Sequence, residues 1–228
     1  METIRYFHQP TISESLGNGW YVLKKHFWWL LLVVIITSIF DGPSAKYTYD
    51  SEGSILKAIG AASLLIGFGT LIFLLVRPVV SWGAKRIFLQ CARNENPNLS
   101  YLFAGFQHNY FNIVLTNLLL TIIIVAGFLF LILPGIFLAI RLVFVPYLVV
   151  DKELEPMKAI ETSWKMTSGY EFTILGMALM SIFIVIIGLI CLVVGVFPAI
   201  IWINSSFASL YQAVLSKIKE NSEVSIEI

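Results

Sequence analysis

Long apolar runs alternate with short polar connections along this chain. A helix needs roughly 20 apolar residues to cross the hydrocarbon core of a bilayer, which is about 30 Å thick. Six runs reach or approach this length, and they cover residues 20–40, 55–80, 110–133, 136–150, 172–196 and 199–215. The pattern predicts an all-α polytopic membrane protein with six transmembrane helices in a single domain, residues 1–228.

The composition points in the same direction. Hydrophobic residues make up 58% of the 228 positions and charged residues 13%, whereas a soluble domain carries about 25% charged residues. Lys and Arg together number 15 and Asp and Glu 14, so the net charge of +1 predicts no nucleic-acid partner. The polar, mixed start of the chain does not fit a cleavable signal peptide, and the first apolar run is expected to stay as an anchor.

Basic residues are distributed unevenly between the connections. The second connection holds four of them, whereas the Pro-Gly and Phe-Pro connections hold none. Because basic connections remain in the cytoplasm, the asymmetry places both termini there. The short outer connections predict that the six helices form three hairpins, with a tight turn at Pro134 and Gly135 and a kink at Pro146.

Two cytoplasmic connections have helical periodicity. Residues 81–94 place apolar side chains on one face and basic ones on the other, which predicts an amphipathic helix along the lipid headgroups. In residues 156–167, Met157, Ile160 and Trp164 recur at helical spacing after a proline suited to a first turn. This second helix could dock a protein partner on the cytoplasmic face, or lie on its own bundle or on the bilayer.

The segment "LPGIFLAIRLVFVPYLVVDKELEPMKAIETSWKMTSGY" resembles a group of six-span bacterial membrane proteins related to YciC, and the membrane domain fused to some glycerophosphodiester phosphodiesterases. The shared pattern is a Pro-Gly turn, a basic or polar residue in the span, a proline, an acidic stretch and an A-x-x-x-S helix ending near glycine. It falls here on Pro134, Gly135, Arg141, Pro146, Asp151, Ala159, Ser163 and Gly169. The resemblance implies a multi-pass fold in the bacterial cytoplasmic (inner) membrane, and it carries no activity across.

Arg141 is the one charge expected deep inside a span. An arginine at the centre of a span costs about 2.5–3.5 kcal/mol on insertion scales, so it faces protein, water or a lipid phosphate. No Asp or Glu falls inside the six expected spans, which leaves neutral partners such as Asn117 and Asn204. Arg141 is therefore expected either to staple the bundle through amides and carbonyls, to hold an anionic ligand, or to snorkel to the interface.

The basic side chains Lys85, Arg86 and Arg93 are further candidates for binding anionic lipid, and as topology determinants they need no other role. No motif places a nucleophile beside a base, and no His, Cys, Asp and Glu spacing suggests a metal site. We therefore expect no enzyme activity, no catalytic residues and no cofactor.

Enzymes and ion-driven transporters are the classes of protein that the sequence disfavours. The chain is expected to be a non-catalytic membrane protein that binds membrane lipids or a protein partner in envelope maintenance. The alternative is a facilitator-type transporter of an anionic or amphiphilic solute, because an ion-driven transporter would need carboxylates or histidines inside the membrane.

Overall fold

The computed structural model describes residues 10–40, 75–107, 109–190 and 195–224. All regular structure in these ranges is helical. The helices are α1 (Ile12–Phe40), an unlabelled helix over residues 75–92, α3 (Tyr101–Ala104), α4 (Tyr110–Phe130), α5 (Ile132–Arg141), α6 (Val145–Lys152), α7 (Pro156–Thr167), α8 (Glu171–Ile190) and α9 (Val196–Val224).

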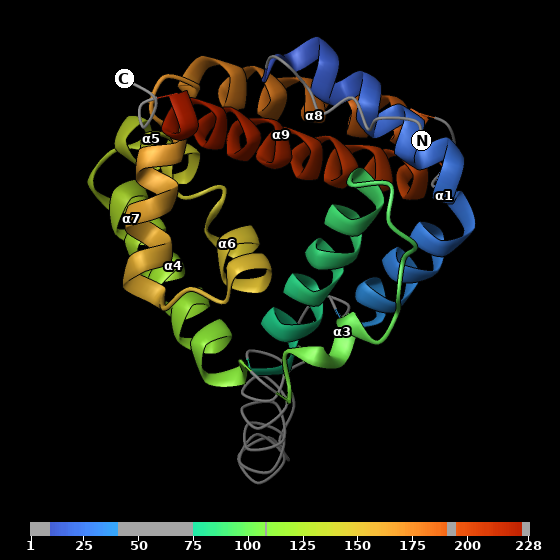
Figure 1. Cartoon of the computed structure of the whole chain (residues 1–228), viewed down its shortest axis with the longest axis horizontal. Helices are drawn as coiled ribbons and strands as arrows, with labels where there is room; N and C mark the ends of the chain where they lie inside the picture. Colours follow the sequence, from blue (N-terminus) through green and yellow to red (C-terminus); the bar gives the residue numbers. More distant parts are fainter. Residues whose placement is uncertain (1–9, 41–74, 108, 191–194, 225–228) are drawn as a thin grey trace, which may run out of the picture.

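The short helix α6 lies at the centre of the bundle. In Figure 1 it is surrounded by α4, α5 and α7 on one side, the helix over residues 75–92 on the other, and α9 above. Five of its eight residues are buried, namely Val145, Tyr147, Leu148, Val149 and Val150. Burial of apolar side chains from all these helices forms one continuous core.

Helices α1 and α9 lie side by side, although they are far apart in the sequence (Figure 1). The Asn18 amide donates to the Ser209 hydroxyl at 2.8 Å, and the Trp202 indole nitrogen donates to the Leu16 carbonyl at 2.9 Å. A β-carbon at Gly19 would come within 2.8 Å of a backbone nitrogen of α9. Glycine at this position therefore lets the two helix backbones approach closely.

The turn between α4 and α5 lies earlier than the sequence suggests. Leu131 has extended backbone angles and ends α4, while Pro134 and Gly135 already belong to α5. The expected turn at the Pro-Gly pair is thus wrong by three residues, because proline is equally well suited to a first helical turn. Gly135 instead allows close packing, since a β-carbon there would meet the Phe128 ring at 2.6 Å.

The expected fourth span, residues 136–150, is a broken helix. It comprises the end of α5 and most of α6, separated by a turn over residues 142–144. Pro146 lies in the first turn of α6, where its missing N–H and its ring prevent α5 from continuing. The Ser163 hydroxyl of α7 donates to the Arg141 carbonyl at 2.7 Å and so satisfies one acceptor at the end of α5.

Four stretches of the described chain are long and apolar enough to cross a membrane: Ile12–Ser38, Tyr110–Phe130, Ile132–Lys152 and Glu171–Ile190. The described part of the chain is therefore all-helical and has the helices of a membrane protein. The expected second span lies mostly outside the described residues, and α9, which contains the expected sixth, is not among the four. A total of six spans and the orientation stay predictions.

The structure describes both of the expected amphipathic helices, and it differs from the predictions in different ways for each. Helix α7 has the predicted bounds, but its packed face carries Ala159, Ser163 and Met166, whereas Met157 is 70% exposed. Residues 81–92 belong to the longer helix over residues 75–92, whose apolar face is buried against protein, and residues 93 and 94 form the turn that follows it. The apolar face of this helix therefore contacts the bundle and not lipid, whereas the expected position of residues 81–94 at the level of the headgroups stays a prediction.

Candidate anion-binding site

A cavity of about 170 Å³ lies between α1, the helix over residues 75–92 and α9. We call it the basic cavity. Its walls are formed by Val34 and Thr37 of α1, by Ile200 and Asn204 of α9, and by six residues of the middle helix, Arg77, Val80, Ser81, Ala84, Lys85 and Phe88. Arg77, Ser81 and Lys85 follow one another at four-residue steps and therefore share one helix face.

The described walls of the basic cavity carry two positively charged side chains. Arg77 and Lys85 supply the two cations, and no Asp or Glu is among the described residues that line the space. Burial lowers the pKa of Lys85 to about 8, because desolvation disfavours its charged form. Its ammonium lies 5.0 Å from the centre of the Tyr147 ring, and no ion pair to it is present within the described ranges.

Asn204 adds a neutral donor to the basic cavity. Its amide nitrogen donates one hydrogen to the Ile200 carbonyl at 2.9 Å, and the second amide hydrogen remains for another acceptor. Lys85 and Asn204, predicted separately as candidates, are thus brought together in one space. An oxyanion placed there would accept bonds from an ammonium, a guanidinium and an amide.

Arg93 lies outside the basic cavity and is already paired. Its guanidinium donates two parallel bonds to the Asp151 carboxylate, at 2.7 and 2.9 Å, and a third to the Gln212 amide oxygen at 2.9 Å. The Tyr211 hydroxyl donates to the same carboxylate at 3.2 Å. Burial alone would lower the pKa of Arg93, but its bond to Asp151 and the charge of that carboxylate raise the pKa overall. Arg93 is therefore a fixed cation that joins three helical segments.

Arg141 also has an acidic partner, contrary to expectation. Its guanidinium lies 2.7 Å from the Glu171 carboxylate, and a second nitrogen donates to the Trp164 carbonyl at 3.4 Å. The rings of Phe137 and Trp164 lie 5.1 and 5.4 Å from the guanidinium carbon. The expectation of purely neutral partners is wrong because Glu171 opens α8 one residue before the expected start of that span.

The two asparagines expected near Arg141 take part in hydrogen bonds within their own helices. The Asn117 backbone carbonyl accepts a bond from the Thr121 hydroxyl, one turn further along α4. No hydrogen bond joins Asn117 or Asn204 to Arg141 in the part of the chain that the structure describes. The arrangement around Arg141 therefore supports the structural interpretation, in which this side chain fastens α5 to α7 and α8.

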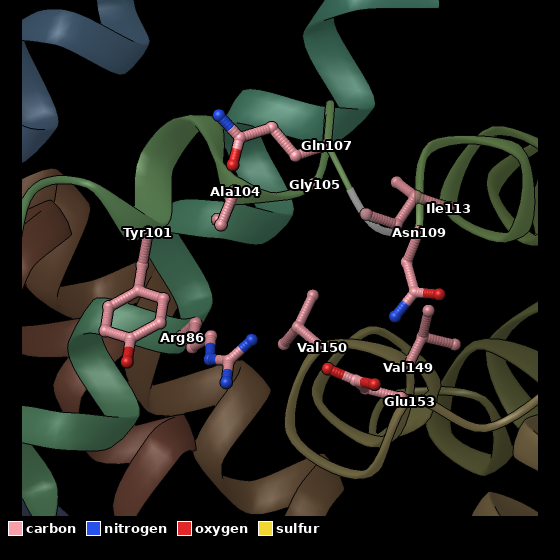
Figure 2. Close-up of a pocket in the computed structure, with 11 residues that line it drawn as sticks. Arg86, Tyr101, Ala104, Gly105, Gln107, Asn109, Ile113, Val149, Val150 and Glu153 are labelled. Carbon is pink, nitrogen blue, oxygen red and sulfur yellow. The ribbon is translucent and has the colours of Figure 1, made fainter.

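Arg86 faces a different space from its neighbour Lys85. Successive residues of a helix point about 100° apart, and the Arg86 guanidinium lies 4.5 Å from the centre of the Tyr101 ring. It lines a larger cavity, of about 260 Å³, shown in Figure 2. The candidates predicted as a single basic set are thus divided among two cavities and one ion pair.

Among the described residues, no group of three or more His, Cys, Asp and Glu side chains could hold a metal ion. Sequence reasoning missed Arg77, Ser81 and Thr37 as members of the basic cavity. The four-residue spacing of Arg77, Ser81 and Lys85 could have indicated that these residues share one helix face. Nothing in the sequence indicated that Thr37 would lie beside them.

No protein-family model matches the chain, and neither a curated protein nor a solved structure is found to be similar to it. The resemblance to the YciC-related group therefore stays a prediction. Function has to be argued from the cavities themselves.

Proposed function

We propose that this protein is a non-catalytic integral membrane protein whose basic cavity binds the phosphate group of an anionic lipid. The observation that supports this proposal is the lining of the basic cavity, in which the described residues bring two cations and an amide hydrogen to one space. Phosphate oxygens accept strong, charge-assisted bonds from guanidinium and ammonium groups. Arg77 and Lys85 provide one group of each kind.

The state of Lys85 supplies the driving force. Its pKa is lowered to about 8 because burial disfavours the charged ammonium. A phosphate in contact with the ammonium would compensate the buried charge and would raise its pKa again. Binding energy would then come from relief of an existing electrostatic cost as well as from new hydrogen bonds.

The membrane arrangement completes the proposal. Six spans with both termini in the cytoplasm of a bacterial cell would put the helix over residues 75–92 close to the cytoplasmic leaflet. Anionic lipids give that leaflet a negative surface potential, which attracts basic segments. Reporter fusions in the connections would test the orientation, and an outward-facing reporter after residue 94 would overturn it.

Native mass spectrometry of the purified protein tests lipid binding. The detergent-stripped protein would be offered phosphatidylglycerol or phosphatidylcholine in equal amounts. Wild type should retain phosphatidylglycerol at least about tenfold better, since each tenfold step needs only about 1.4 kcal/mol. The Lys85→Met variant should lose this preference.

Lys158→Met is the matched control, because Lys158 lies on α7 with 68% of its side chain exposed and only an exposed neighbour as partner. This variant should bind lipid as wild type does. If Lys85→Met keeps the full preference for phosphatidylglycerol, the basic cavity does not bind the lipid and the proposal fails.

The facilitator alternative is favoured by one observation, the break between α5 and α6. Interrupted helices often line the solute path of membrane transporters, because their free backbone groups can contact a solute. Flux of a fluorescent organic anion into proteoliposomes would favour this alternative. Flux equal to that of empty liposomes would count against it.

A further inference from the structure

The cavity around Arg86 differs from the basic cavity because it carries both signs of charge. It lies between the helix over residues 75–92, the segment from α3 to the start of α4, and the end of α6 (Figure 2). Arg86 is its cation and Glu153 its carboxylate, while Gln107 and Asn109 contribute amides. We call it the zwitterionic cavity.

The two charges of this cavity are not paired with each other. Figure 2 shows the Arg86 guanidinium and the Glu153 carboxylate facing the same open space from two sides, with Val150 on the wall between them. No ion pair joins these side chains, both of which the structure describes, and no other cation is paired with Glu153 in the described ranges. A ligand that carries both charges would satisfy both side chains at once.

The backbone of Glu153 is unusual in a way that fits this role. Its φ of 53° and ψ of 32° place it in the left-handed region, at the residue that ends α6. Glycine or asparagine is the ordinary choice there, because a longer side chain adopts this region at a cost. The glutamate gives up local backbone stability, and its carboxylate is directed into the cavity (Figure 2).

We propose that the zwitterionic cavity binds a primary ammonium and a nearby oxyanion of one small molecule or headgroup, as in phosphoethanolamine. The Arg86 guanidinium would hold the phosphate oxygens, because its planar fork matches their geometry. Glu153 would accept hydrogen bonds from the ammonium, and the Asn109 amide would donate to a remaining oxygen.

The lining also excludes a close relative of this ligand. Choline carries three methyl groups in place of ammonium hydrogens and is recognised by cages of several aromatic rings. Among the described residues that line the zwitterionic cavity, Tyr101 is the only aromatic one, and the Arg86 guanidinium lies 4.5 Å from the centre of its ring. The zwitterionic cavity should therefore bind a ligand with a primary ammonium more tightly than one with a quaternary ammonium.

Native mass spectrometry of the full-length, delipidated protein tests the inference with two matched lipids. Phosphatidylethanolamine and phosphatidylcholine share the phosphate and differ only in methylation of the amine. Wild type should retain the ethanolamine lipid at least about tenfold better, since loss of a hydrogen bond to a charged group is expected to cost an order of magnitude in affinity. Equal retention of the two lipids, with no binding of free phosphoethanolamine, would overturn the proposal.

Two variants of Glu153 separate ligand loss from misfolding. Glu153→Gln removes the charge and keeps the size of the side chain. Glu153→Gly removes the carboxylate and also relieves the left-handed backbone, so the protein should unfold at a higher temperature while losing the ligand. A Glu153→Gly protein that keeps full preference for ethanolamine would overturn the assignment.

Free phosphoethanolamine distinguishes the two sources of the ligand. Displacement of labelled phosphatidylethanolamine by the free compound, or binding of the free compound alone, would identify a soluble zwitterion as a ligand. Binding of the lipid without displacement would identify the headgroup. Phosphatidylglycerol has no amine, and its proposed site is the basic cavity. If the zwitterionic cavity binds no phosphoethanolamine group, the retention of phosphatidylglycerol should still depend on Lys85, so the two proposals can fail separately.

Discussion

The ion pair between Arg93 and Asp151 provides the sharpest test of how this bundle is held together. Asp151, near the end of α6, is only 9% exposed, and Arg93 is 21% exposed. The pair forms two parallel hydrogen bonds, at 2.7 and 2.9 Å. Asp151→Asn would keep the size of the side chain, remove its charge and leave the guanidinium enclosed without an anion.

The magnitude follows from the exposure of the pair. Removing one partner of a fully buried pair costs about 3–5 kcal/mol, most of it from the charge left behind. Water reaches about a fifth of the Arg93 side chain, which reduces this penalty, so we expect a loss of about 2–3 kcal/mol for Asp151→Asn. Arg93→Gln should cost a similar amount, because it leaves the carboxylate without its cation.

A double-mutant cycle separates the pair from its surroundings. The single variants Asp151→Asn and Arg93→Gln and their combination would be unfolded in detergent with a denaturant, and tryptophan fluorescence would report the free energy of unfolding. The combined variant should be more stable than the sum of the single losses implies, by about 1–2 kcal/mol. Stability losses that add to within about 0.3 kcal/mol would refute the idea that this contact ties α6 to the bundle.

Glu161→Gln is the control for this cycle. Glu161 bonds to Lys165 at 2.7 Å, in a similarly short contact, but both side chains are more than half exposed on α7. Surface pairs of this kind contribute little to stability. The control should unfold as wild type does, and a loss as large as that of Asp151→Asn would show that burial does not set the effect.

Four further outcomes follow from other parts of the structure. Phosphatidylglycerol binding should weaken as the pH rises through about 8, because Lys85, whose pKa is about 8, loses the charge that attracts the phosphate; binding titrations should show no such loss in Lys85→Met. Cys91 is fully buried and its pKa is raised to about 12, so maleimide should label it in a Cys191→Ser background only after unfolding. Gly19→Ala should lower the melting temperature, since the new β-carbon would lie within 2.8 Å of α9 backbone. Glu171→Gln should cost about 1–2 kcal/mol in denaturant unfolding, because Arg141 is 12% exposed and loses its anion; unchanged stability would show that the pair is not structural.

Local signals in the sequence were sufficient for several elements. The bounds of α7, Pro156–Thr167, were predicted correctly. The signals were a proline suited to a first helical turn and the apolar residues that follow it at helical spacing. The same periodicity identified the buried face of residues 81–94. Both features depend on neighbours within two turns of a helix, so the sequence contains the information needed.

Features that depend on distant contacts could not be read in this way. The break after α5 falls inside the expected fourth span, where Pro146 is the helix-breaking residue. Glu171 lies 30 positions after Arg141, so nothing local indicated that the two would meet. Each cavity combines residues from separate helices, and its lining becomes visible only when these helices pack.

The pairing of α1 with α9 has a consequence for how the protein is made. α9 is synthesised after every other helix of the described chain, so α1 enters the membrane long before its partner exists. During that interval Asn18 has no Ser209 to bond, and the close-packing surface around Gly19 faces lipid or the insertion machinery. The contacts between α1 and α9 can therefore form only after synthesis has passed α9.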